Sequence, residues 1–165
     1  MESVRIRPSA ELAESTRAAF DHHGNQVLLL LPDAEVEHVG ATSVPGALTK
    51  GDLDVLVRVQ ASEFARAVAV LRNAYAIHQP HNWTPTLASF NDPASSAPPV
   101  GVQLVAAGSA SDALFGPFRD ALIADPALLV EYNALKLRLD GASYERYTTT
   151  KGAFIETVLQ KLNPA

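Results

Sequence analysis

Two aspartates one residue apart are the side chains of this sequence best suited to chemistry. Asp52 and Asp54 stand at the start of the apolar segment Leu53–Val59, and residues two apart on a strand point to the same face of a sheet. A glycine- and hydroxyl-rich turn precedes them in the sequence. Carboxylates are hard oxygen ligands for Mg²⁺, and clustered backbone N–H groups bind phosphates. The spacing therefore predicts a site for a divalent metal that holds phosphate groups.

The turn adds several groups to this predicted site. Gly40 permits a positive φ and a close approach of the backbone to a ligand, while Thr42 and Ser43 offer hydroxyl groups. Lys50 adds a positive charge just before the aspartates. The alternative is an ordinary tight loop followed by solvated charges at a strand end, because an isolated pair of this kind is common.

Composition limits the classes of protein to consider. The 165 residues, 47% of them hydrophobic and 19% charged, are typical of one globular domain. A formal charge of −5 argues against broad, non-specific binding of nucleic acid. The absence of cysteine excludes disulfides, thiolate metal sites and a cysteine nucleophile. With no apolar signal segment and no run approaching the ~20 residues of a membrane span, we expect a soluble, cytoplasmic protein.

Periodicity and turn residues predict an α+β fold in which the helices gather toward the C-terminus. We expect a single domain, residues 1–165, with an α/β core at 1–107 and a helical part at 108–165. The predicted helices are 9–31, 63–73, 111–124, 126–139 and 150–162. The predicted strands are 35–39, 53–59, 75–78, 86–90 and 100–106, with a turn or flexible loop at 91–99.

Three stretches of the sequence resemble the GrpB family, a branch of the nucleotidyltransferase superfamily. HVGATSVPGALTKGDLDVLV, which starts at His38, is similar to the family signature. FRDAL, which starts at Phe118, and the Y-x-x-x-K spacing of Tyr132 are similar to its helical region. The Y-x-x-x-K-x-x-F tail of the family is matched at Tyr147, Lys151 and Phe154.

The resemblance implies a nucleotidyltransferase-like fold, a small mixed β-sheet flanked by helices. It implies that Gly40, Thr42 and Ser43 contact nucleotide phosphates, and that Asp52 and Asp54 are catalytic residues that bind Mg²⁺ or Mn²⁺. The expected partners are a nucleoside triphosphate and an acceptor that the sequence does not identify. Nucleic acid is not favoured, no membrane is implied, and the oligomeric state is unknown.

Two positions depart from the pattern of active transferases. Ala41 stands where the superfamily usually has a serine, so phosphate contact must shift to neighbouring hydroxyls or backbone N–H groups. On the later strand the residue in register is Gln103, where active transferases often carry a third carboxylate. A glutamine can form hydrogen bonds but cannot act as a general base. Both departures favour binding over catalysis.

Other residues are weaker candidates. Lys151 is a possible cationic helper, with residues 148–150 expected to cap the start of a helix beside it. Arg119, Lys136 and Arg146 could also supply cations to a triphosphate, although we expect Arg119 and Lys136 to form salt bridges on helix surfaces. Tyr132 and Tyr147 could stack on a base, although a buried tyrosine is the commoner case. Trp83 could be a nucleobase lid or an interface anchor, and the sequence does not separate these or assign a role to the loop from His78 to His81.

Three functions remain open from the sequence. The first is Mg²⁺-dependent nucleotidyl transfer. The second is a catalytically inactive nucleotide- or metabolite-binding module, an accessory role that the family's fusions to dephospho-CoA kinase make credible by resemblance. The third is a structural interaction domain built on the helical tail and Trp83.

Overall fold

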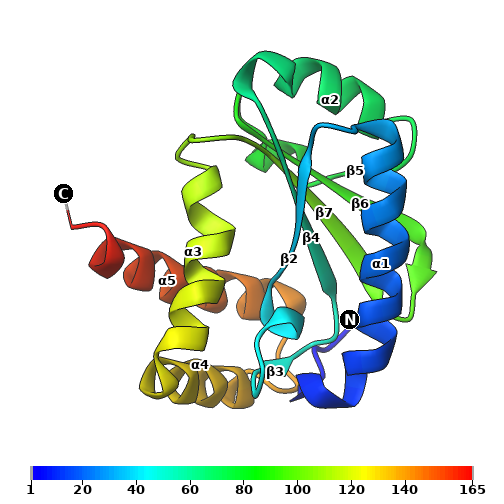
Figure 1. Cartoon of the computed structure of the whole chain (residues 1–165). Coiled ribbons are helices and arrows are strands. Elements are labelled where there is room, and N and C mark those ends of the chain that lie inside the picture. The colour runs from blue at the N-terminus through cyan, green and yellow to red at the C-terminus, as the bar shows by residue number, and fades with distance from the viewer. Residues whose placement is uncertain (1, 165) are drawn as a thin grey trace.

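A five-stranded mixed sheet, in the order β2-β4-β7-β6-β5, forms the centre of the fold (Figure 1). The computed structural model of the chain describes residues 2–164. The strands are β1 (Arg7–Pro8), β2 (Glu35–Val39), β3 (Leu48–Thr49), β4 (Leu53–Val59), β5 (Ala76–His78), β6 (Leu87–Ser96) and β7 (Pro99–Ala106). The helices are α1 (Ala13–Leu30), α2 (Phe64–Leu71), α3 (Asp112–Ala124), α4 (Pro126–Arg138) and α5 (Tyr144–Leu162).

The register of the sheet separates the core from the candidate site. β4 and β7 are parallel, whereas the other neighbouring strands of this sheet are antiparallel. Leu53, Val55 and Val57 of β4 are fully buried on one face. Asp54 points to the opposite face, where it lies beside Gly101 of β7. Alternation along one strand thus buries a hydrophobic row and presents a carboxylate on the other side.

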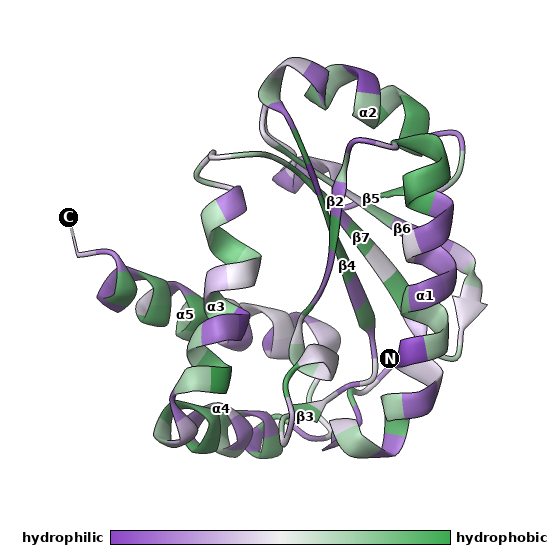
Figure 2. Cartoon of the chain, in the orientation of Figure 1, coloured by the Kyte–Doolittle hydropathy of each residue, from purple (hydrophilic) through white to green (hydrophobic). Residues whose placement is uncertain are grey.

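The hydrophobic face of the sheet packs against α1 and α2. Val27 of α1 and Leu71 of α2 are fully buried there, together with Phe90 of β6. Figure 2 shows the hydrophobic stretches of β4 and β7 running through the middle of the molecule. Burying such apolar area is the main source of stability in a domain of this size, at about 25 cal/mol per Å².

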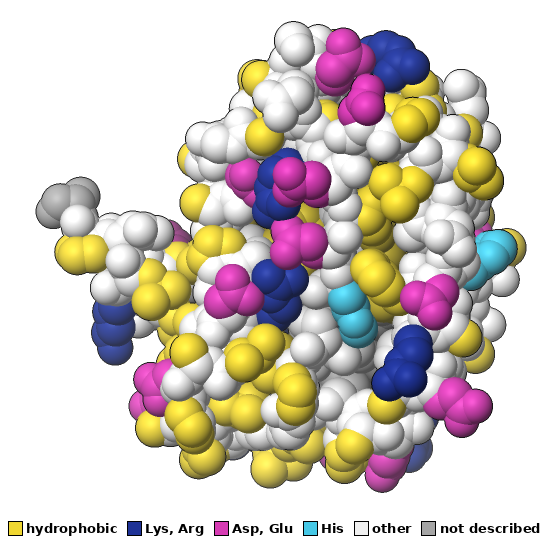
Figure 3. All heavy atoms as spheres, in the orientation of Figure 1, with side chains coloured by type: hydrophobic (Ala, Val, Ile, Leu, Met, Phe, Trp, Pro, Cys, Tyr) yellow, Lys and Arg dark blue, Asp and Glu magenta, His cyan; other side chains and the backbone are white. Residues whose placement is uncertain are grey.

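Helix α3 lies against the opposite face and is held to it by ion pairs. Arg58 of β4 bonds Asp112 at 2.6 Å and Glu37 at 2.7 Å. Arg119 bonds Glu37 at 3.1 Å and donates to the His38 carbonyl at 3.0 Å. Burial alone would raise the pKa of Glu37, but hydrogen bonds from the two arginines lower it. Figure 3 shows these oppositely charged side chains interleaved between α3 and β2.

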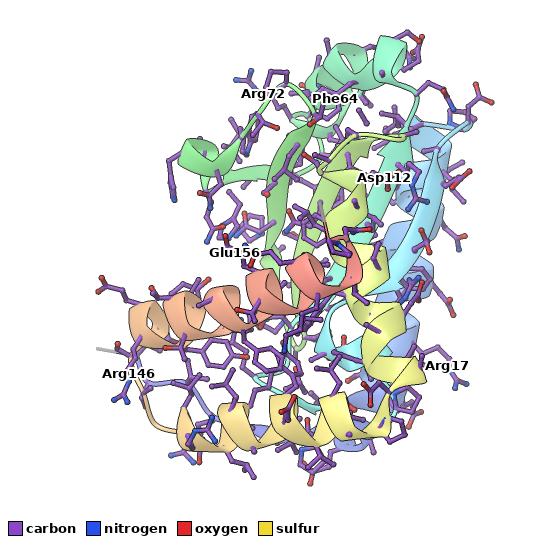
Figure 4. The ribbon with its side chains drawn as sticks, turned by 90° about the vertical axis from the view of Figure 1, so that its left-hand side faces the viewer. Arg17, Phe64, Arg72, Asp112, Arg146 and Glu156 are labelled. Atoms are coloured by element: carbon purple, nitrogen blue, oxygen red, sulfur yellow. The ribbon has the colours of Figure 1, made fainter. Side chains whose placement is uncertain are left out.

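Helices α4 and α5 form a second layer with a core of its own. Tyr132 of α4 stacks on Phe154 of α5 with ring centroids 5.4 Å apart, and Phe118 of α3 meets Tyr132 edge to face. Side chains fill the space between α4 and α5, and Asp112 lies at the end of α3 that is nearer the sheet (Figure 4). Within residues 2–164, no helix combines the length and the apolar character needed to cross a membrane.

The expected fold class is confirmed, as a mixed α/β structure with a five-stranded sheet flanked by helices. The predicted loop at 91–99 is wrong, because β6 continues to Ser96 and pairs with β7, which begins at Pro99. The register shifts between Asp92 and Ser96, and such an irregularity accommodates Pro93, which has no N–H to donate.

The predicted start of the last helix at residue 150 is also wrong. Helix α5 begins at Tyr144, and the Ser143 side chain caps it by accepting a hydrogen bond from the Arg146 N–H. The three threonines at 148–150 lie inside the helix. Their β-branched side chains lower helix propensity only slightly, and tertiary packing overrides that preference. Lys151 therefore does not stand beside a helix N-terminus.

Candidate functional site

The Asp54 carboxylate is held between two glycines. Gly40 follows β2 and has a φ of 76°, and a Cβ atom added to it would overlap Asp54 Oδ2. A Cβ on Gly101 would lie 3.4 Å from Asp54 Oδ1. Glycine is therefore required at Gly40 for two reasons, the left-handed backbone and the carboxylate that fills the space of a side chain.

The two turn hydroxyls are already bonded to the protein backbone. Thr42 Oγ1 donates to the Asp52 carbonyl at 3.1 Å and lies 2.8 Å from His38 Nε2. Because the single hydroxyl proton goes to Asp52, His38 Nε2 must carry the proton that it donates to Thr42. Ser43 Oγ donates to the Gly40 carbonyl at 2.6 Å. Thr42 thus ties the turn to the residue that precedes β4, and Ser43 closes the turn on itself. In this arrangement neither hydroxyl has a proton to donate to a phosphate.

Three lysines from three different elements surround the two carboxylates. Lys50 contacts Asp52 directly and lies over the Tyr144 ring. Lys136 Nζ lies 4.5 Å from the centre of the Tyr132 ring, and Lys151 Nζ lies 5.3 Å from that of Tyr147. The last two pairs are one helical turn apart in α4 and α5, so each ring shields the ammonium of its own helix.

Burial shifts the pKa of most charged groups at this site. It raises the pKa of Asp54, while Lys151, Lys50 and Lys136 act in the opposite direction. Burial, and then repulsion by Lys151, lowers the pKa of Lys50 to about 8. At neutral pH Lys50 thus keeps the charge that its contact with Asp52 requires. Burial likewise lowers the pKa of Lys151 and brings that of Lys136 to about 6.

The third position predicted from the sequence lies on the same face of the sheet as Asp54. Gln103 of β7 is opposite Leu56 of β4 on one side and Ser89 of β6 on the other. Ser89 Oγ donates to Gln103 Oε1 at 2.6 Å, which leaves the amide NH₂ of Gln103 to face a ligand. His78 of β5 continues this row next to Ser89. The row therefore offers donors, and no carboxylate, beside Asp54.

Two clefts meet at the candidate site. The larger, of about 830 Å³, is bounded by the N-terminal segment, by β6 and β7, and by the start of α5. The smaller, of about 310 Å³, lies beneath α3 and against α4 and α5. The two clefts share five of their lining residues: Lys50, Asp52, Asp54, Gln103 and Lys151. Any group held by these five residues faces both clefts at once.

The structure gathers most of the predicted residues but not all of them. The five shared residues were predicted, and Gly40 lines the smaller cleft. Thr42 and Ser43 line neither cleft.

The loop that contains Trp83 is anchored to the core, since Trp83 Nε1 donates to the His78 carbonyl at 3.0 Å and the ring packs on Phe90.

The expected surface position of Lys136 is wrong. This side chain is only 1% exposed, and its Nζ donates to the Leu48 carbonyl at 2.8 Å. The repeated Tyr-x-x-x-Lys spacing, at Tyr132 and again at Tyr147, was the signal that could have identified it. Arg119 does form the expected ion pairs, but with a side chain only 17% exposed.

The two aspartates fit Mg²⁺ or Mn²⁺ in the chemistry of their oxygen atoms. Within residues 2–164, no group of three or more His, Asp or Glu side chains stands ready to hold a metal. Mg²⁺ is often held by one or two carboxylates together with the phosphates of its substrate, and Asp52 and Asp54 suit that mode. Binding would require the contact between Lys50 and Asp52 to open, which frees Lys50 to meet a phosphate.

Comparison with solved structures agrees with the fold. A GrpB protein from Enterococcus faecalis superposes with a TM-score of 0.72 at 21% identity, over 89% of this chain and 92% of that one. The Cid1 poly(U) polymerase with bound MgGTP superposes with a TM-score of 0.53 at 15% identity. That match spans 79% of this chain but only 43% of the polymerase chain. At these identities the likeness concerns the fold alone, which is nucleotidyltransferase-like.

Sequence comparison identifies closer relatives. The chain is 42% identical to a UPF0157 protein of Vibrio cholerae, over 96% of this chain and 83% of that protein. It is 32% identical to a UPF0157 protein of Deinococcus radiodurans, over 87% of this chain and 76% of that protein. The family model described as GrpB protein matches residues 10–161. The chain therefore belongs to the GrpB family.

Proposed function

We propose that this protein binds a nucleoside triphosphate together with Mg²⁺ and transfers the nucleotidyl group to an acceptor. The observation that carries the proposal is the junction of the two clefts. Two carboxylates and two lysines stand there on facing elements, and phosphoryl-group transfer depends mainly on positioning and on neutralising charge.

Each residue of the junction has a part in this proposal. Asp52 and Asp54 would hold the metal ion, which supplies a positive charge to the phosphates when it is bound. Lys151 and the released Lys50 bind phosphate oxygens. Gly40 lets the turn approach Asp54, and the larger cleft has room for a whole nucleotide, since ligand pockets span roughly 300–1,000 Å³.

A second candidate function is nucleotide binding without turnover. The observation that favours it is Gln103, whose amide stands where a third carboxylate would act and whose Oε1 is already bonded to Ser89. A site with two carboxylates can hold a metal-bound nucleotide yet leave an acceptor hydroxyl protonated.

Titration calorimetry of the intact chain tests the proposal. ATP, CTP, GTP and UTP are each titrated with Mg²⁺ into the wild type and into Asp52→Asn/Asp54→Asn. We expect at least one nucleotide to bind the wild type, and the double variant to bind it about tenfold more weakly or worse. Asp21→Asn/Asp33→Asn, which also removes two negative charges but at exposed positions, is the charge-matched control. Equal affinity in the wild type and the double variant rejects the site, and pyrophosphate release separates transfer from binding alone.

A further inference from the structure

The smaller cleft has one apolar wall and one charged wall. Its apolar wall is formed by Leu114, Phe115 and Phe118 of α3 with Ile155 of α5. The opposite wall carries the junction and Lys136. A molecule that fills this cleft therefore needs a hydrophobic body and one polar end.

The charged wall favours an anion. The Asp, Glu, Lys, Arg and His residues that line this cleft are two aspartates and three lysines. A metal ion held by the aspartates would neutralise the carboxylate charges, and Lys50 and Lys151 would then face the ligand. Ammonium groups form charge-assisted hydrogen bonds with carboxylate and phosphate oxygens, which are stronger than bonds between neutral groups.

Among the described residues that line the smaller cleft, no side chain is placed to deprotonate a hydroxyl. Gln103 cannot act as a base, and Lys136 is almost completely buried with its Nζ bonded to the Leu48 carbonyl. The two aspartates would hold the metal ion in the proposed function. His78 and Asp92 line the larger cleft and not this one. An alcohol in the smaller cleft would reach the junction still protonated, whereas a carboxylate or phosphate arrives ionised.

We propose that the acceptor is a compact acid, with an apolar body and one carboxylate or phosphate group, bound in the smaller cleft. This inference rests on the proposed function. Its oxyanion is the nucleophile. Lys151 orients the anion, and the apolar wall beneath α3 selects the body. The volume of about 310 Å³ excludes a polynucleotide from this cleft and sets the upper size of the acceptor.

The step balances without a base. An oxygen of the acid forms a bond to the α-phosphorus of the nucleotide, and the bond from that phosphorus to the bridging oxygen of the β-phosphate breaks. Pyrophosphate leaves with the electron pair. The product is an acyl nucleotidate from a carboxylate, or a phosphoanhydride from a phosphate monoester. No proton is transferred, which matches a site with Gln103 in place of a carboxylate.

Binding of matched probes tests the cleft without turnover. Benzoate, benzyl phosphate and benzyl alcohol share one ring and differ in the charged end, and each is titrated into the protein preloaded with Mg²⁺ and a non-hydrolysable nucleotide. We expect either acid to bind about ten- to a hundredfold more tightly than the alcohol, the range for a hydrogen bond to a charged group. Equal or tighter binding of the alcohol overturns the proposal.

Leu114→Trp fills the smaller cleft from its partly exposed rim, and Ala113→Trp adds the same side chain next to it on the exposed side of α3. We expect Leu114→Trp to lose acid binding and Ala113→Trp to retain it, with nucleotide binding unchanged in both. Acid binding that survives Leu114→Trp places the acid outside this cleft and overturns the proposal.

Transfer is then followed as pyrophosphate release and by mass spectrometry of the nucleotidyl product, with isovalerate and isoamyl alcohol as a second matched pair. We expect release with the acids and none above background with the alcohols. Nucleotide binding with release only from alcohols, or with no release from any probe, overturns the acid acceptor and leaves nucleotide binding standing. A wild type that binds no nucleotide overturns the proposed function itself.

Discussion

Gly40 is constrained both by its positive φ and by its contact with the Asp54 carboxylate. Gly108 has a similar φ but no such contact. Gly40 and Gly108 have φ values of 76° and 75°. A Cβ on Gly40 would overlap Asp54, whereas nothing lies within 4 Å of a Cβ on Gly108. Both positions therefore carry the cost of a positive φ, and only Gly40 adds the overlap with the carboxylate.

We expect Gly108→Ala to lose about 1–2 kcal/mol of unfolding free energy, the cost of a left-handed alanine. Gly40→Ala must displace Asp54 and also places alanine at a φ of 76° and a ψ of −179°, a region essentially confined to glycine, so we expect a clearly larger loss and a loss of nucleotide binding. Urea unfolding and titration calorimetry measure the two effects. Equal losses in the two variants, with nucleotide binding kept in Gly40→Ala, would contradict this role.

Lys136 makes the stability of the fold depend on pH. Burial, and then repulsion by Lys151, lowers its pKa to about 6, whereas a lysine in an unfolded chain titrates near 10.4. As the pH falls from about 10 to about 6, the unfolded chain takes up this proton first, so stability is lost over that interval. Lys136→Met removes the titrating amine and keeps most of the buried stem.

We therefore expect the unfolding free energy of the wild type, minus that of Lys136→Met, to rise as the pH increases from about 6 to 9. Urea unfolding at a series of pH values measures this difference. Lys161→Met, at an exposed lysine of α5, controls for the loss of one positive charge. A difference that stays flat or falls as the pH rises contradicts a buried, titrating Lys136.

At the scale of elements, helix α4 fixes the segment that leads into the site. Asn133 accepts from the Leu48 N–H at 2.9 Å and donates to the Gly46 carbonyl at 3.0 Å. Lys136 holds the Leu48 carbonyl from the same helix face. Lys50 and Asp52 follow directly, so their positions depend on three hydrogen bonds from α4.

We expect Asn133→Ala to cost about 1–3 kcal/mol, because it leaves the partly buried Leu48 N–H without its partner. It should also weaken nucleotide binding without touching the ligand. Asn73→Ala removes a hydrogen bond to the Ala69 carbonyl at an exposed site away from the clefts and should change neither quantity by much. Nucleotide affinity that is unchanged in Asn133→Ala would separate α4 from the site.

The sequence predicted the elements whose patterns are local. Alternation identified β2 and β4, and the spacing of Asp52 and Asp54 placed both carboxylates near the same cleft. Prediction from the sequence failed at segments whose structure is decided by contacts with residues distant in the chain. The stretch 91–99 looks like a loop because of its three prolines, yet β6 continues to Ser96 and pairs with β7. Lys136 looks like a surface residue in the sequence of its own helix. The residues that bury it come from β3, from α5 and from the site itself, and a local pattern does not show them.

At the scale of the molecule, the sheet and the helical layer meet along the line where the two clefts join. Asp52, Asp54 and Gln103 come from the sheet side and Lys151 from α5. A ligand at the junction contacts both layers, and binding to the folded state alone raises stability by mass action. The proposed function therefore requires that a metal-bound nucleotide occupies this junction through the two aspartates.

A crystal structure of the protein soaked with Mn²⁺ and a non-hydrolysable nucleoside triphosphate tests that claim most directly, because Mn²⁺ is located by its anomalous scattering. We predict Mn²⁺ bound by Asp52 and Asp54, phosphate oxygens on Lys151, and a Lys50 side chain that has left Asp52. Mn²⁺ bound elsewhere, or a nucleotide whose phosphates lie away from the junction, would contradict the proposed nucleotide site.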